Sequence, residues 1–259
     1  MLLNSVIFVL REVLEASLII SVLLALSQNQ AMSKKWAFPA VLVGLVMAGF
    51  YASQLATISS YFDGVGQELV NAGLHFLVYV FILLTVVLLK YPGTKSLALL
   101  AMSGCVVFAS VREASEIIIY LVGFVGIPDL FSSVLIGSII GAGLGLSVGV
   151  LFYYLIVYAR LERGLFFGLL LLVLIAGGMV SQTIQLLTQA DFISSQMPIW
   201  DSSFLVDERS LFGELLYALI GYESTPTLIQ FVSYSVSILF AGILTVSTFL
   251  SSPLLAKPR

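Results

Sequence analysis

Long apolar stretches alternate along the chain with short stretches that are polar or turn-forming. A helix needs about 20 apolar residues to cross a bilayer, and seven stretches have that length. The pattern predicts membrane-spanning helices at about 3–27, 36–57, 68–90, 96–122, 130–158, 164–189 and 227–251. Pro, Gly and charged residues mark the turns between them. We therefore expect an all-α polytopic membrane protein with seven transmembrane helices.

The composition agrees with this interpretation. Of the 259 residues, 60% are hydrophobic and 10% are charged, and the mean hydropathy is +1.12, whereas a soluble domain carries about 25% charged residues. The single cysteine, Cys105, excludes an internal disulfide, and the single histidine, His75, excludes a zinc centre built on paired histidines. The sequence has no nucleophile–base motif and no nucleotide-binding signature, so we expect neither an enzyme nor a nucleic-acid-binding protein.

The charged loop residues separate into two groups in a seven-helix arrangement. One side holds most of the basic residues: Lys34, Lys35, Lys90, Lys95, Arg160, Arg163, Lys257 and Arg259. The other side holds Arg209 as its only basic residue, among many acidic ones. Because basic loops stay in the cytoplasm, we expect the N-terminus outside and the C-terminus in the cytoplasm. The expected location is the plasma membrane, which is the inner membrane in a bacterium.

The first and fourth predicted helices each carry an Arg-Glu-x-x-Glu motif near the middle. Its residues are Arg11, Glu12 and Glu15 in the first helix, and Arg112, Glu113 and Glu116 in the fourth. A charge at the centre of a membrane helix costs about 2.5–3.5 kcal/mol. We therefore expect both motif faces to turn inward, toward each other or toward a water-filled cavity. The spacing predicts the ion pairs Arg11–Glu15 and Arg112–Glu116.

Four motif glutamates face two arginines, which leaves a formal surplus of two negative charges in a low dielectric. Protonation of the carboxylates or binding of a cation would relieve this surplus. Oxygen ligands suit hard cations such as ferric iron, Mn²⁺, Mg²⁺ or Ca²⁺, and ferrous iron less selectively. A proton relay is also compatible with these groups. The alternative is that the charges are structural ion pairs that fix helix register, but intramembrane charges are usually functional.

The two motifs open two units of three predicted helices each. Because three is odd, the second unit crosses the membrane in the opposite sense, as in the inverted repeats of many secondary transporters. The chain, 1–259, is then a single transmembrane domain with a 3+3 inverted repeat plus one helix. Its expected parts are repeat one (about 1–92), repeat two (about 93–190), an outer loop (about 190–226) and the last helix (about 227–251).

In both motifs, and in the stretch PIWDSSFLVDERSLFGELLYALIGYESTPT, the chain resembles the oxidase-coupled high-affinity iron permeases of fungi and their bacterial elemental-iron-uptake relatives. The resemblance covers nearly the whole chain. It implies a lipid-embedded permease, with iron as transported substrate and no permanently bound cofactor. It implies a partner outside, an extracytoplasmic oxidase or iron-binding protein that delivers ferric iron. The implied iron ligands are Glu12, Glu15, Glu113 and Glu116, positioned by Arg11 and Arg112. Asn71 departs from the family pattern, which has an acidic residue there.

Three acidic residues are candidates for an access path at the outer mouth. Asp63 and Glu68 would attract cations, although ordinary solvated loop charge is an equal alternative for the loop. Asp201 is expected to cap the helix that follows it, or otherwise to contact metal. Leucines at helical spacing over 211–219 predict a short interfacial or re-entrant helix. His75 is expected to pack or hydrogen-bond between helices.

Three functions are consistent with these observations. The favoured one is a high-affinity permease that moves iron into the cytoplasm through the motif carboxylates. The second is a transporter of another divalent cation, or a proton-coupled carrier that uses the same glutamates. The third is a membrane anchor for an outer redox complex, which has no use for carboxylates buried in the bilayer.

Overall fold

The computed structural model describes residues 1–208 and 210–250, apart from the side chains of Pro92 and residues 248–250. Arg209, Lys257, Arg259 and the predicted cytoplasmic C-terminus lie outside these ranges. The described elements are α1 (Leu2–Asn29), α2 (Ala37–Ser53), α3 (Leu55–Ser60), η1 (Phe62–Gly64), α4 (Gly66–Leu89), η2 (Pro92–Thr94), α5 (Lys95–Phe124), α6 (Pro128–Tyr158), α7 (Leu161–Gln189), α8 (Leu211–Ile220) and α9 (Leu228–Leu250). The described residues form no β-strand, and only an isolated bridge joins Pro198 to Thr227.

A long helix lies at each of the predicted spans. Six of these helices begin and end within about three residues of the predicted bounds. The prediction for 36–57 is wrong at its end, because α2 stops at Ser53 and the separate helix α3 follows. In the described part of the chain, four helices are long and apolar enough to cross a membrane: α4, α6, α7 and Leu228–Ser247 of α9. Helices α1 and α5 carry the motif charges, and α2 has 17 residues.

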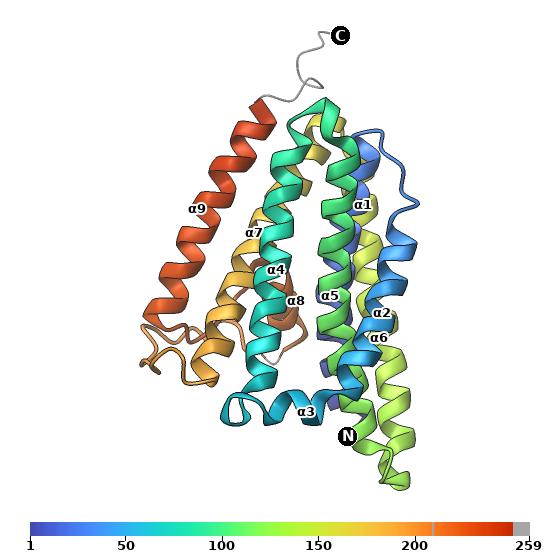
Figure 1. Cartoon of the computed structure of the whole chain (residues 1–259), viewed down its shortest axis with the longest axis vertical. Coiled ribbons are helices and arrows are strands. Elements are labelled where there is room, and N and C mark those ends of the chain that lie inside the picture. Colours follow the sequence, from blue (N-terminus) through green and yellow to red (C-terminus); the bar gives the residue numbers. More distant parts are fainter. Residues whose placement is uncertain (209, 251–259) are drawn as a thin grey trace.

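The long helices stand side by side and alternate in direction, so that successive connections lie at opposite ends of the bundle (Figure 1). The end at the top of Figure 1 is called the basic end, because its connections carry Lys34, Lys35, Lys90, Lys95, Arg160 and Arg163. The opposite end is called the acidic end. It holds the start of α1, helix α3 and the connection from α7 to α9.

Apolar side chains cover the outside of the bundle and also fill its centre near the basic end. Phe38 and Phe50 on α2 and Ile243 on α9 are all more than two-thirds exposed, at 76%, 70% and 69%. Extended apolar surface of this kind is stable in lipid rather than in water. Inside the bundle, the apolar seal consists of Leu23, Leu26, Ile82, Met102 and Leu169, which belong to one buried cluster.

Helix α6 packs along α1 through a face of small residues. Gly137, Gly141, Gly145 and Gly149 are buried against α1, where a β-carbon would meet α1 atoms. The absence of side chains lets the two backbones approach closely. The Ser17 hydroxyl uses this closeness to donate a hydrogen bond of 3.0 Å to the Gly145 carbonyl. The stripe therefore fixes the position of the first motif helix.

Helix α8 confirms the predicted short helix, and it packs against α1 and α7 of the bundle. The Gly213 amide donates to the Ser210 hydroxyl at 3.0 Å, which caps the start. Gly221 ends the helix with a φ of +64°, a left-handed conformation that favours glycine. Its residues Leu215, Ala218 and Leu219 pack against Leu10, Leu14 and Leu18 of α1. Helix α8 thus lies beside the first motif.

Gly141→Ala tests whether the close approach of α1 and α6 stabilises the fold. The added β-carbon would lie 2.5 Å from the Val6 carbonyl oxygen and 2.9 Å from the Leu10 nitrogen, so that α1 must shift. We expect a loss of about 1–3 kcal/mol of stability, typical of overpacking, in unfolding measurements on the detergent-solubilised protein. Gly143→Ala is the matched control, because nothing lies within 4 Å of its β-carbon. Equal effects of the two substitutions would contradict the packing role.

Candidate functional site

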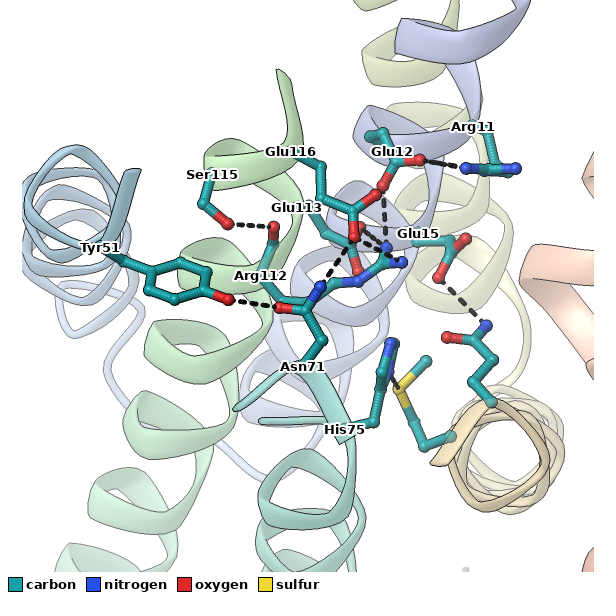
Figure 2. A network of polar contacts seen from close by, with 12 residues as sticks. Arg11, Glu12, Glu15, Tyr51, Asn71, His75, Arg112, Glu113, Ser115 and Glu116 are labelled. Atoms are coloured by element: carbon teal, nitrogen blue, oxygen red, sulfur yellow. Dashed lines mark hydrogen bonds and ion pairs between the residues drawn. The ribbon is translucent and has the colours of Figure 1, made fainter. Parts of the chain in front are cut away.

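Arg112 on α5 holds the two motifs together. Its Nη1 donates to Glu12 Oε2 on α1 at 2.8 Å and also to Glu113 Oε2, and its Nη2 lies 3.2 Å from Glu116 Oε1. Figure 2 shows these carboxylates converging on the guanidinium from both motif helices. The predicted Arg112–Glu116 pair is therefore present, and the motif faces do turn toward each other. One guanidinium here contacts three carboxylates.

Arg11 does not form the ion pair expected from its spacing. Its Nη2 and Nε donate to Glu12 Oε1 at 2.6 and 3.0 Å, and the structure gives no ion pair to Glu15. The prediction of an Arg11–Glu15 pair is thus wrong. The Arg11 side chain is 32% exposed at the edge of the network, and from there it reaches the Glu12 oxygen that Arg112 leaves free. Glu12 consequently bridges the two arginines.

Glu15 differs from the other motif glutamates in its partner. Its Oε2 accepts a hydrogen bond of 3.3 Å from the Gln182 amide on α7, while its Oε1 has no hydrogen-bond partner. The residue is 2% exposed. Glu15 is therefore a buried carboxylate that an amide, rather than a guanidinium, orients.

Three polar residues that the sequence analysis did not place in the site join this network. Asn71 on α4 donates to Glu116 Oε1 at 3.2 Å, and its carbonyl oxygen accepts from the Tyr51 hydroxyl on α2 at 3.1 Å. Gln182 is the third. The departure from the family pattern at Asn71 was the available signal, because an amide can donate to a carboxylate where an acid would repel it. Tyr51 and Gln182 belong to no motif in the sequence: Tyr51 lies near the end of an apolar helix, and Gln182 is one of several polar residues in the last part of α7.

His75 is almost completely buried between α4 and α7. It is 2% exposed, its Nδ1 lies 3.2 Å from Met179 Sδ, and its Nε2 has no partner. The expected hydrogen bond between helices is present, although the acceptor is a thioether. His75 also borders a cavity.

A cavity of about 390 Å³ leads toward the network. It is lined by Arg11, His75, Arg112, Glu116, Gln182, Gln185, Leu186, Gln189, Glu208, Glu214, Tyr217 and Glu223. Gln189 is the last residue of α7, at the acidic end of the bundle (Figure 1), whereas Arg112 and Glu116 lie more than two turns before the end of α5. The cavity therefore connects the segment between α7 and α9, at the acidic end, with the motif charges.

The three predicted access residues are not among those that line this cavity. Asp63 lies exposed in η1, and Glu68 lies in the first turn of α4. Asp201 caps no helix, because Ser210 caps α8, so the capping prediction is wrong. Asp201 instead accepts from the Ser203 hydroxyl at 2.6 Å and from its amide at 2.9 Å, and these hydrogen bonds lower the pKa of Asp201.

Besides Glu116, the acidic residues that line the cavity come from α8 and its flanking segments: Glu208, Glu214 and Glu223. In the sequence these three residues belong to a generally acidic stretch, and no motif singles them out. Glu208 is held by a hydrogen bond from the Ser224 amide. Partial burial and the neighbouring Glu208 carboxylate raise the pKa of Glu223 to about 7.

Carboxylate and amide oxygens dominate the site, which is the ligand type that hard cations prefer. Among the described residues, no group of three or more His, Cys, Asp or Glu side chains is already arranged to hold a metal ion. The guanidinium of Arg112 explains this, because it lies between the carboxylates that would otherwise converge on a cation. A metal ion can contact Glu12, Glu113 and Glu116 together only if the Arg112 guanidinium moves away.

Comparison with family models matches residues 2–256 to the Iron permease FTR1 family. The matched segment contains both motifs, α8 and the residues that line the cavity. No curated protein and no solved structure matches the chain.

The raised pKa of Glu223 predicts a pH dependence of stability. The folded protein holds this proton up to a pH of about 7, whereas the ordinary pKa of glutamate is 4.5. Stability contributed by the protonated carboxyl is therefore complete below pH 4.5 and is lost as the pH rises through 7. Between about pH 5 and 8 the melting temperature of Glu223→Gln should fall less than that of the unaltered protein, as measured by thermal unfolding in detergent. Parallel curves for the two proteins would contradict the assignment.

Proposed function

Because the chain belongs to the Iron permease FTR1 family, it is a multi-pass membrane protein that transports iron across a membrane, and we propose that the four motif glutamates carry the ion. One observation carries this proposal: Arg112 of α5 contacts Glu12 of α1 at 2.8 Å, so that both motifs form one buried cluster. Four carboxylates and two guanidiniums leave a formal charge of −2 there. A cluster that only fixed helix register would need no such surplus.

Arg112 lies where a cation would contact Glu12, Glu113 and Glu116 together. An ion that binds these carboxylates must displace the Arg112 guanidinium. When the ion leaves, the guanidinium returns to the carboxylates. This exchange keeps the carboxylates paired with a positive charge, which limits the cost of burying them. Arg112 and Arg11 are in this proposal positioning residues, and the glutamates are ligands.

Iron enters this route from the acidic end. The cavity extends from that end to Arg112 and Glu116, and Glu208, Glu214 and Glu223 add negative charge along it. On the opposite side of the motifs, the apolar seal fills the centre of the bundle near the basic end. Passage to the basic end then requires a rearrangement of helices, as in alternating access.

The proposed topology has seven spans, with the acidic end outside and the basic end in the cytoplasm. The alternating helix directions and the basic residues of three connections support it (Figure 1). The packing also supports the 3+3 inverted repeat. Helix α1 packs along α6 and α5 packs along α2. These two pairs become equivalent if α1 corresponds to α5 and α2 to α6.

The cargo we propose is ferric iron, delivered at the acidic end by an extracytoplasmic oxidase or iron-binding protein. The oxygen ligands of the arginine-bridged carboxylates suit a hard trivalent ion. The location that fits this role is a plasma membrane, which is the inner membrane in a bacterium. Iron is substrate here and not a resident cofactor.

Glu116→Gln tests the proposal. The substitution keeps the shape of the side chain and removes one ligand charge. We expect iron uptake into cells to fall by at least about tenfold, because loss of even one supporting interaction at a metal site typically has an effect of this size. Radioactive iron uptake is measured at matched membrane abundance, with iron supplied as ferric ion or kept ferrous by a reductant.

Glu162→Gln is the matched control, because Glu162 is exposed in the first turn of α7. It should transport iron at the unaltered rate. Normal uptake by Glu116→Gln would contradict the ligand role of the motif. Equal or faster uptake of ferrous iron by the unaltered protein would contradict the ferric cargo.

A further inference from the structure

Seven buried polar side-chain atoms have no hydrogen-bond partner within the described structure, and three of them, on three different helices, are acceptors that lie close to the motif charges. These three are Glu15 Oε1 on α1, His75 Nε2 on α4 and Gln182 Oε1 on α7. The three residues are 2%, 2% and 4% exposed. Buried polar atoms are nearly always paired, so three unpaired atoms in one region of a transporter require an explanation.

The hydrogen bond of His75 shows that its unpaired nitrogen is an acceptor. Its Nδ1 lies 3.2 Å from Met179 Sδ, and a thioether sulfur can accept but cannot donate. Nδ1 therefore carries the hydrogen, and Nε2 carries a lone pair. Imidazoles that bind metal ions are commonly held in this way, with the second ring nitrogen donating to a neighbour.

The same reasoning fixes the amide of Gln182. Its nitrogen lies 3.3 Å from Glu15 Oε2, and an ionised carboxylate only accepts. The NH₂ group thus faces Glu15, and the amide oxygen is the free atom. Glu15 Oε1, Gln182 Oε1 and His75 Nε2 are therefore three acceptors without a donor.

These acceptors belong to one region of the cavity. His75 and Gln182 both line it, and Gln182 is bonded to Glu15. Met179, which holds the His75 ring, lies one turn before Gln182 on α7. His75 extends from α4 toward the arginine-bridged carboxylates (Figure 2). Arg112 lines the same cavity, and its positive charge would repel a cation there. However, its Nη atoms contact three carboxylates, whose combined negative charge exceeds the positive charge of Arg112.

We infer that Glu15, His75 and Gln182 form a second cation site, which takes a divalent transition-metal ion such as ferrous iron. One carboxylate, one amide oxygen and one imidazole nitrogen suit borderline divalent ions, whereas the arginine-bridged glutamates offer only oxygen. The inference rests on the proposed function, since the ion reaches this site through the same cavity. It extends the cargo of that cavity to divalent ions.

Direct detection of the nitrogen–metal bond tests the site. The chain has a single histidine, so that full-length protein labelled with ¹⁵N-histidine, and purified without a histidine tag, gives the signals of one imidazole. ¹¹³Cd²⁺ is the probe, because it is divalent, binds nitrogen and does not change oxidation state. We expect one-bond coupling between ¹¹³Cd and Nε2 of His75 in the nuclear magnetic resonance spectrum. Bound Cd²⁺ without coupling, or no Cd²⁺ binding in equilibrium dialysis, would overturn the inference.

Two variants on α7 distinguish a glutamine that binds the metal ion from one that only lines the cavity. Gln182→Leu should weaken Cd²⁺ binding by at least about tenfold. Gln185→Leu, which also changes a glutamine lining the cavity, should bind within about twofold of the unaltered protein. Equal affinities for both variants would remove Gln182 from the site. Cd²⁺ coupling together with normal ferric uptake by Glu116→Gln would instead contradict the proposed function and leave this site standing.

Discussion

The neutralisation of Arg112 inside the bundle is the constraint on which the site depends. A buried guanidinium is stable only when carboxylates surround it, and here they come from two helices, with Glu12 on α1 and Glu113 and Glu116 on α5. The contact from Arg112 to Glu12 therefore couples the position of α1 to that of α5. Because Arg11 adds a second positive charge to Glu12, the two motifs act as one charged unit and not as two separate ion pairs.

The surrounding helices hold this unit while leaving it open on one side. The glycine face of α6 lets α1 lie close, and α8 packs beside the first motif on the apolar residues of α1. Two polar side chains hydrogen-bond to motif carboxylates: Asn71 of α4 contacts Glu116, and Gln182 of α7 contacts Glu15. The cavity is bounded by α7 and α8, so the same elements that position the charges also form the path to them.

Sequence patterns predicted the helices and the inward turn of both motif faces, because both follow from simple rules. Apolar length predicts a span, and the cost of an intramembrane charge predicts that charged faces turn inward. The partner of Arg11 was not predictable, because helical spacing places Glu15 and Glu12 both within reach of a long flexible side chain. Asp63 was a candidate because it is an acidic residue at the predicted outer mouth, and Asp201 because it was expected to cap a helix or otherwise to contact metal. The fold of 190–226 brings Glu208 and Glu223 to the cavity instead. Loop conformation, unlike helix periodicity, has no local pattern that reveals it.

Locating the ion directly shows whether iron binds where the carboxylates of the two motifs meet. Crystals of the full chain loaded with ferric iron, and measured at the iron absorption edge, give an anomalous map that shows the metal alone. We expect a peak within bonding distance of oxygens of glutamates on both α1 and α5, with the Arg112 guanidinium displaced. A peak confined to residues 190–226, with Arg112 still bonded to Glu12, would contradict this location of the ion.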